Sequence, residues 1–189
     1  MNTTNTRIPL VGLLVVQLVI GYEWAMSGLT KIVRGGFPSG LADELREKSE
    51  GAAGWYTSFL DSVVIPNAQG WGYVIEIGEL LIGLVLIGAA LVWLFAWERV
   101  GAQMRRNLLL GTVLASLGGI AMAVNFHLAN GAAHPWLIPA DGFDEGVDLD
   151  SLLPAIQLVL AAVSGRLWWL ARRQREVELS TQRRLHTAA

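Results

Sequence analysis

The chain has 189 residues, of which 53% are hydrophobic and 16% are charged, whereas soluble domains carry about a quarter charged residues. This balance argues against an ordinary soluble domain, and the net charge of −2 gives no sign of a nucleic-acid partner. The chain has no cysteine, which excludes disulfides, thiol catalysis and cysteine-ligated zinc or iron–sulfur centres. Any redox chemistry would belong to a bound organic cofactor or to a partner subunit.

Four stretches are long and apolar enough to cross a bilayer as helices, since about 30 Å of hydrocarbon requires roughly 20 residues. They cover residues 8–33, 72–97, 108–128 and 152–171. Their apolar residues run continuously and do not alternate as in a barrel strand, and a helix satisfies its own backbone groups in lipid. We predict an all-α, single-domain integral membrane four-helix bundle.

The first stretch has a second interpretation, as a secretory signal peptide. Arg7 precedes an apolar run, and small residues follow around Ser27, in the order of a signal peptide and its cleavage site. The apolar character continues past Ser27, and removal of the segment would leave an odd number of spans. We therefore interpret it as a membrane span.

The segment at 34–71 is too long for a simple turn. Residues 41–50 are expected to form a short amphipathic helix, because Leu41 and Leu45 share one side of it. Such a helix would lie in the outer interface as a lid over the bundle. The alternative is a packed loop that only covers the helices.

Basic residues gather before the first span, between the second and third, and after the fourth. By the positive-inside rule these ends are cytoplasmic, which predicts a multi-pass protein of the cell membrane with both termini inside and a basic cytoplasmic tail at 172–189. The residues concerned are Arg7, Arg99, Arg105, Arg106, Arg166, Arg172, Arg173, Arg175, Arg183 and Arg184.

The loop at 129–151 is acidic and contains no lysine or arginine, which suits an outer loop. Aromatic residues fall at both predicted boundaries, as in the aromatic belts of membrane proteins. The acidic residues are Asp141, Asp144, Glu145, Asp148 and Asp150; the aromatic ones are Trp71, Tyr73 and Trp136 outside, and Trp93, Trp97, Trp168 and Trp169 inside.

Small residues are expected at the contacts between spans, because helices in lipid associate through close packing of their backbones. These residues indicate packing and not activity. The candidates are Gly21, Ala25, Gly28, Gly83, Gly88, Ala115, Gly119 and Ala123.

Ionisable residues inside membrane spans are costly and are by default candidates for function. Glu23 and Lys31 in the first span, Glu76 and Glu79 in the second, and Asn125 in the third all fall in the outer half. The spacing of Glu23 and Lys31 puts them on one helix face, and Glu76 and Glu79 are neighbours on another. Two polar stripes are thus available to meet.

Two interpretations of these stripes remain open. One is a polar pocket that binds a quinone head group or relays protons, with a carboxylate facing an internal cavity. The other is an internal ion pair in which Glu23 or Glu79 neutralises Lys31 in a dry interior. The three histidines, His127, His134 and His186, are not at metal-binding or bis-histidine haem spacing, so we predict no metal or haem.

The motif residues of the first three spans resemble the DoxX/DoxD group of small four-helix membrane proteins. The likeness is carried by Gly21-Tyr22-Glu23-Trp24-Ala25-Met26-Ser27-Gly28-Leu29-Thr30-Lys31 with Gly36-Phe37, by Gly78-Glu79-Leu80-Leu81-Ile82-Gly83, and by Asn125. It implies a four-helix bundle and, as in some members, a part in a thiosulfate:quinone oxidoreductase or another redox complex. Motif positions of the family fall on Gly28, Lys31 and Glu79.

The leading hypothesis is therefore a membrane subunit of a redox or respiratory assembly, with quinone as cofactor and with lipid and other membrane-associated subunits as partners. The alternatives are a proton- or cation-coupled small transporter or channel, and a non-catalytic membrane scaffold. The predicted catalytic residues are Glu79, Lys31 and Glu23, and the predicted cofactor-binding residues are Glu76, Asn125, Trp24, Ser27 and Gly28.

Overall fold

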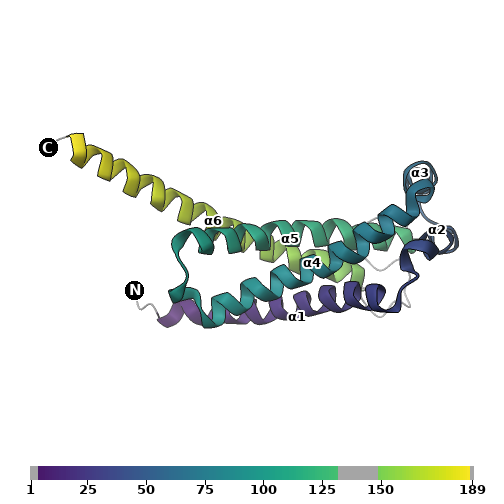
Figure 1. Cartoon of the computed structure of the whole chain (residues 1–189), viewed down its shortest axis with the longest axis horizontal. Coiled ribbons are helices and arrows are strands. Elements are labelled where there is room, and N and C mark those ends of the chain that lie inside the picture. The colour runs from purple at the N-terminus through teal and green to yellow at the C-terminus, as the bar shows by residue number, and fades with distance from the viewer. Residues whose placement is uncertain (1–3, 132–148, 188–189) are drawn as a thin grey trace.

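The computed structural model describes residues 4–131 and 149–187, and every regular element in these ranges is a helix. Four helices are long and apolar enough to cross a membrane, which confirms the predicted all-α fold class. They lie side by side along one axis as an elongated bundle (Figure 1). They are α1 (Thr4–Arg34), α4 (Ala68–Phe95), α5 (Ala102–Ala129) and α6 (Leu149–Thr187).

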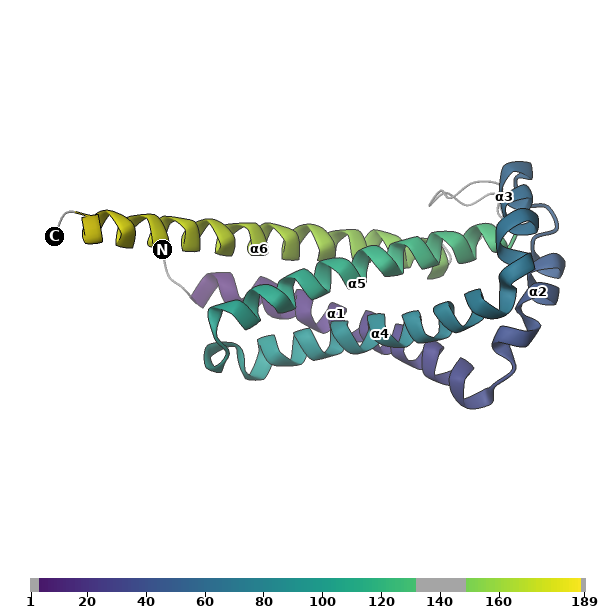
Figure 2. The ribbon, with the colours of Figure 1, turned by 45° about the horizontal axis from the view of Figure 1, so that its top comes forward.

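The segment between α1 and α4 is also helical. It contains α2 (Phe37–Lys48), α3 (Gly54–Phe59), a π-helical turn η1 (Leu60–Val64) and a 3-10 turn η2 (Ile65–Asn67), and η2 leads directly into α4. These elements cap one end of the bundle (Figure 2). We call this the pocket end. We call the opposite end, with the α4–α5 connection and its 3-10 turn η3 (Trp97–Arg99), the tail end.

α2 begins four residues before the predicted start of the helix at residue 41. Gly35 and Gly36 turn the chain with φ values of +69° and +81°, a left-handed conformation that glycine adopts at little steric cost. Pro38 then stands in the first turn of α2, where a missing N–H leaves no intrahelical hydrogen bond unmade. The glycine pair and the proline together fix where this helix starts.

α1 packs mainly against α4, and α5 mainly against α6. The α1–α4 contact depends on glycine: a Cβ at Gly28 would lie 2.5 Å from the backbone nitrogen of Leu80, and one at Gly83 would overlap the backbone of Ala25. A Cβ at Gly88 would meet nothing within 4 Å. Of the two predicted contact glycines in α4, only Gly83 therefore lies in a helix contact.

The interior is apolar where the four helices meet, while large apolar side chains also cover the outside. Val19, Leu114 and Leu158 are each more than half exposed, as expected for surfaces that face lipid chains. The buried cluster consists of Ile20, Trp24, Ile82, Leu86, Ala115, Ala123 and Leu153.

α6 is longer than its neighbours and continues past the tail end (Figure 1). Its 39 residues extend about 58 Å at 1.5 Å per residue. Toward its C-terminal part, the Arg173 guanidinium carbon lies 4.1 Å from the centre of the Trp169 ring. Most of the predicted acidic loop, with Asp141, Asp144, Glu145, Asp148 and Trp136, lies outside the described residues.

Candidate functional site

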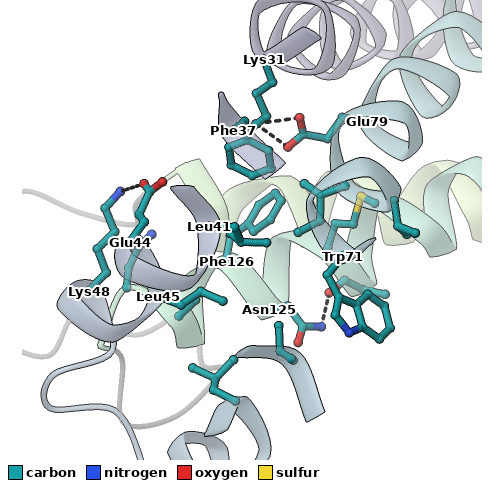
Figure 3. A pocket seen from close by; sticks show the side chains of 18 of the residues that line it. Lys31, Phe37, Leu41, Glu44, Leu45, Lys48, Trp71, Glu79, Asn125 and Phe126 are labelled. Atoms are coloured by element: carbon teal, nitrogen blue, oxygen red, sulfur yellow. Dashed lines mark hydrogen bonds and ion pairs between the residues drawn. The ribbon is translucent and has the colours of Figure 1, made fainter. Parts of the chain in front are cut away.

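A cavity of about 520 Å³ lies at the pocket end, beneath α2 and α3. Small-molecule sites in proteins typically measure about 300–1,000 Å³. Side chains from α1, α2, α4 and α5 form its walls, and α3 and η1 contribute to its cover. Figure 3 shows the labelled side chains converging on it from these separate elements.

One end of the cavity carries an ion pair. The Nζ atom of Lys31 donates hydrogen bonds to both carboxylate oxygens of Glu79, at 2.7 and 2.8 Å (Figure 3). The Oγ atom of Ser27, one turn before Lys31 on α1, accepts from Nζ at 2.8 Å and donates to Glu79 Oε2 at 3.1 Å. Three side chains from two helices therefore share one closed hydrogen-bond arrangement.

Both charges are shielded from solvent. The Glu79 side chain has no exposed surface, and that of Lys31 is 24% exposed. Removing one member of such a pair leaves an uncompensated charge, so each depends on the other. The Lys31 Nζ atom also lies 5.2 Å from the centre of the Phe37 ring and 5.8 Å from that of Phe126, close enough for cation–π attraction.

The rest of the lining is mostly apolar. Aromatic and aliphatic side chains from three helices face the space between the ion pair and the cover. They are Phe37, Leu41 and Leu45 of α2, Trp71, Val74 and Ile75 of α4, and Met122 and Phe126 of α5. The cavity is thus amphipathic: the Lys31–Glu79 ion pair lies at one end, and apolar side chains form the walls beside it.

Tyr56 ties the cover to α5. Its hydroxyl donates to the backbone oxygen of Asn125 at 3.0 Å and lies 3.3 Å from the side-chain Oδ1 of the same residue. The Nδ2 atom of Asn125 donates to the Ala121 backbone oxygen at 2.7 Å. Asn125 therefore holds α3 against α5 through its backbone oxygen and its side-chain Oδ1, and its side-chain amide was predicted to bind a ligand.

Four of the predicted site residues line the cavity, namely Ser27, Lys31, Glu79 and Asn125. Trp24 does not line it, but its ring is buried and packs against Phe126, with 6.4 Å between ring centres. It thereby supports one wall of the cavity from below.

The other three predicted residues lie elsewhere. Gly28 lies in the α1–α4 contact, where its missing side chain allows close approach to the backbone of Glu76 and Leu80. Glu76 is buried but does not line the cavity, and Glu23 is exposed on α1. The predicted convergence therefore holds for Lys31 and Glu79 and does not extend to Glu23 and Glu76.

Several lining residues were not among the predicted site residues. The sequence contained a weak indication of a role for Phe37, which belongs to the quoted family motif, and for Trp71, which belongs to the predicted aromatic belt. The sequence contained no such indication for Tyr56 and Phe126, because their place in the site depends on which helices pack together.

The pocket and ion-pair interpretations describe the same place. Lys31 and Glu79 are paired, as the ion-pair interpretation expects, and both line a cavity, as the pocket interpretation expects. Within the described residues no group of three or more histidine, aspartate or glutamate side chains is placed to hold a metal ion. The chemistry available at the ion pair is hydrogen bonding, charge stabilisation and proton exchange.

The chain matches no model of a known protein family, no curated protein and no solved structure. The likeness to the DoxX/DoxD group therefore stays a prediction that rests on the motif residues. Function has to be argued from the cavity itself.

Proposed function

We propose that this chain is a membrane subunit of a redox assembly, similar to the DoxX/DoxD group, and that the cavity at the pocket end binds the ring of a quinone. The observation that carries the proposal is the Lys31–Glu79 pair at the end of a cavity whose lining is mostly aromatic and aliphatic. Apolar walls with a few well-placed polar groups are typical of sites for such ligands. A quinone ring matches this distribution, with two apolar faces and carbonyl oxygens at its edge.

In this proposal Lys31 and Glu79 have different tasks. Lys31 donates a hydrogen bond to a ring oxygen and stabilises the negative charge that develops there on reduction. Glu79, hydrogen-bonded to Ser27, exchanges the two protons that the reduced ring requires, one with each electron. Reduction to the quinol takes two electrons and two protons, and the electrons would come from a redox-active partner subunit.

The proposal places the pocket end at the outer leaflet of the cell membrane and the tail end in the cytoplasm. Basic residues at the tail end support this orientation through the positive-inside rule. They include Arg99, Arg105 and Arg106 near the α4–α5 connection and Arg172 and Arg173 on the projecting part of α6.

Proton- or cation-coupled transport is the second candidate, and two buried polar side chains in the middle part of the bundle favour it. Gln157 and Ser116 are fully buried, and their side-chain polar atoms have no hydrogen-bond partner in the described part of the chain. Further toward the tail end, the amide of Gln17 donates to the Leu86 backbone oxygen, and the Thr112 hydroxyl bonds within its own helix. The hydrogen-bonding capacity of these two side chains is therefore already used within the protein, so they do not add support for a polar path to the tail end.

Quinone binding can be measured on the purified chain in lipid nanodiscs. We expect a benzoquinone with a short side chain to quench tryptophan fluorescence, because Trp71 lines the cavity. Glu79→Gln should weaken binding at least tenfold, or about 1.4 kcal/mol. Trp71→Phe should remove most of the quenching signal.

The matched control is Glu98→Gln. Glu98 is an exposed glutamate at the tail end and lies 3.8 Å from Arg105, so its loss should leave quinone affinity unchanged. Absence of quenching in the unmodified chain would reject quinone binding. Intact activity of the partner subunits after Glu79→Gln would favour the third candidate, a non-catalytic scaffold.

A further inference from the structure

Some residues that line the cavity are also exposed to solvent, as residues at its rim would be. They form two sets with different chemistry. One set is polar and consists of Glu44 and Lys48 on α2 and Asn130 on α5; the other is mostly apolar and consists of Trp71 and Val74 on α4 and Ala121 and Asn125 on α5. Phe59 of the cover is exposed as well. The second set spans two adjacent helices and marks a lateral opening between them.

The lateral opening lies well inside the spans. Val74 comes six residues after the start of α4, and Ala121 eight residues before the end of α5. At 1.5 Å per residue these positions are about 9 and 12 Å below the pocket end. In a membrane they would face lipid chains, whereas Glu44 and Lys48 on α2 would face the interface.

The opening has a defined lower edge. A Cβ at Gly78 would lie 2.5 Å from the Cε atom of Met122, and one at Gly118 would lie 3.6 Å from the Cδ1 atom of Ile82. Below the cavity α4 and α5 are therefore in direct contact, with Met122 lying across Gly78. The gap is local to the cavity and not a general separation of the two helices.

The side-chain amide of Asn125 at the lateral rim is already engaged. The Nδ2 atom of Asn125 bonds to the backbone of Ala121 within α5, and its Oδ1 atom lies 3.3 Å from the Tyr56 hydroxyl. Trp71 and Val74 present apolar surface on the facing helix. A ligand passing here would meet mostly apolar surface and the already bonded amide of Asn125, which suits an apolar chain and not a hydrated head group.

We infer that the ligand of this cavity is a lipid-soluble molecule with one long apolar chain, whose ring lies at Lys31 and Glu79 and whose chain leaves between α4 and α5 into the bilayer. The inference rests on the proposed function and narrows it to a membrane-resident, isoprenoid-tailed quinone. A cavity of about 520 Å³ has room for a ring and a short length of chain, so the remainder of a long chain needs the lateral opening.

The test narrows the opening from both sides with Val74→Phe/Ala121→Phe. Phenylalanine fills space without adding a tryptophan to the fluorescence signal. The matched control is Leu81→Phe/Leu117→Phe, which alters exposed residues of α4 and α5 that do not line the cavity. Association rates are measured in nanodiscs by stopped-flow quenching, with a tail-less benzoquinone and with the same ring carrying a long isoprenoid chain.

We expect the double phenylalanine variant to slow association of the tailed quinone at least tenfold and that of the tail-less quinone less than threefold, since the polar rim stays open. The control variant should bind both at the unmodified rate. Equal effects on both quinones, or no effect on either, would overturn the lateral opening while leaving ring binding intact. If the unmodified chain binds neither quinone, the proposed function fails and this inference fails with it.

Discussion

At the scale of single residues, each charge of the Lys31–Glu79 ion pair is tolerated because the other is present. The Glu79 side chain is fully buried. Lys31, which stands one turn after Ser27 on α1, forms the ion pair with it. Double replacement of a buried ion pair by apolar residues is often close to neutral, whereas loss of one partner is strongly destabilising. The pair should therefore behave as a unit in mutational tests.

Lys31→Met is expected to destabilise the bundle by about 3 kcal/mol, because it leaves the Glu79 carboxylate buried without a counter-charge. Glu79→Leu should cost less, since Lys31 retains some exposure. The double variant Lys31→Met/Glu79→Leu should regain most of the lost stability and still fail to bind quinone. Unfolding in detergent measures all three variants, and strictly additive effects of the two changes would contradict the coupling.

The site was predictable from the sequence only in part, and helix rotation explains why. Glu76 and Glu79 are three residues apart, which places them about 60° apart around the axis of α4. That difference is enough for Glu79 to face the cavity while Glu76 does not line it. Spacing shows which residues share a face, but the direction of that face depends on the packing partner.

At the scale of elements, the α1–α4 contact depends on particular glycines. Gly83 lies against the backbone of Ala25, and in lipid such close approach supplies much of the attraction between helices. This contact also positions the site, because Lys31 and Ser27 stand on α1 and Glu79 stands on α4. Any change that separates α1 from α4 should therefore also weaken the ion pair.

Gly83→Ala should lower the unfolding midpoint clearly and reduce quinone binding, because the added methyl group would overlap the backbone of α1. Gly88→Ala, on the same helix, is the matched control, since a Cβ there meets nothing within 4 Å. It should be neutral or stabilising by up to about 1 kcal/mol, as alanine is the better helix former. Equal destabilisation by both changes would argue against a specific contact at Gly83.

The long helices were the most predictable elements, because continuous apolar runs of their length have few other structures in lipid. The segment between α1 and α4 was less so. Its helix starts at Phe37 and not at residue 41, and the chain after Gly54 stays helical through a π turn and a 3-10 turn that includes Pro66. The start of α2 follows from the glycine pair before it and the proline in its first turn, a local signal that the apolar pattern does not include. The helical path from Gly54 to Asn67 depends on contacts that local patterns do not contain.

At the scale of the whole molecule, the proposed orientation can be tested directly because the chain has no native cysteine. Glu47→Cys on α2 and Gln174→Cys on α6 each introduce one thiol at an exposed position at opposite ends. In intact cells a membrane-impermeant maleimide should label Glu47→Cys and should label Gln174→Cys only after permeabilisation. The reverse pattern would invert the topology and place the cavity on the cytoplasmic side.

No described residue of α6 lines the cavity. α6 instead packs mainly against α5 and extends beyond the bundle at the far end. The cavity and the C-terminal extension are thus spatially separate parts of the molecule. A fluorescent protein or affinity handle fused after α6 should leave ligand affinity unaltered, so the chain can be immobilised there while its cavity stays accessible.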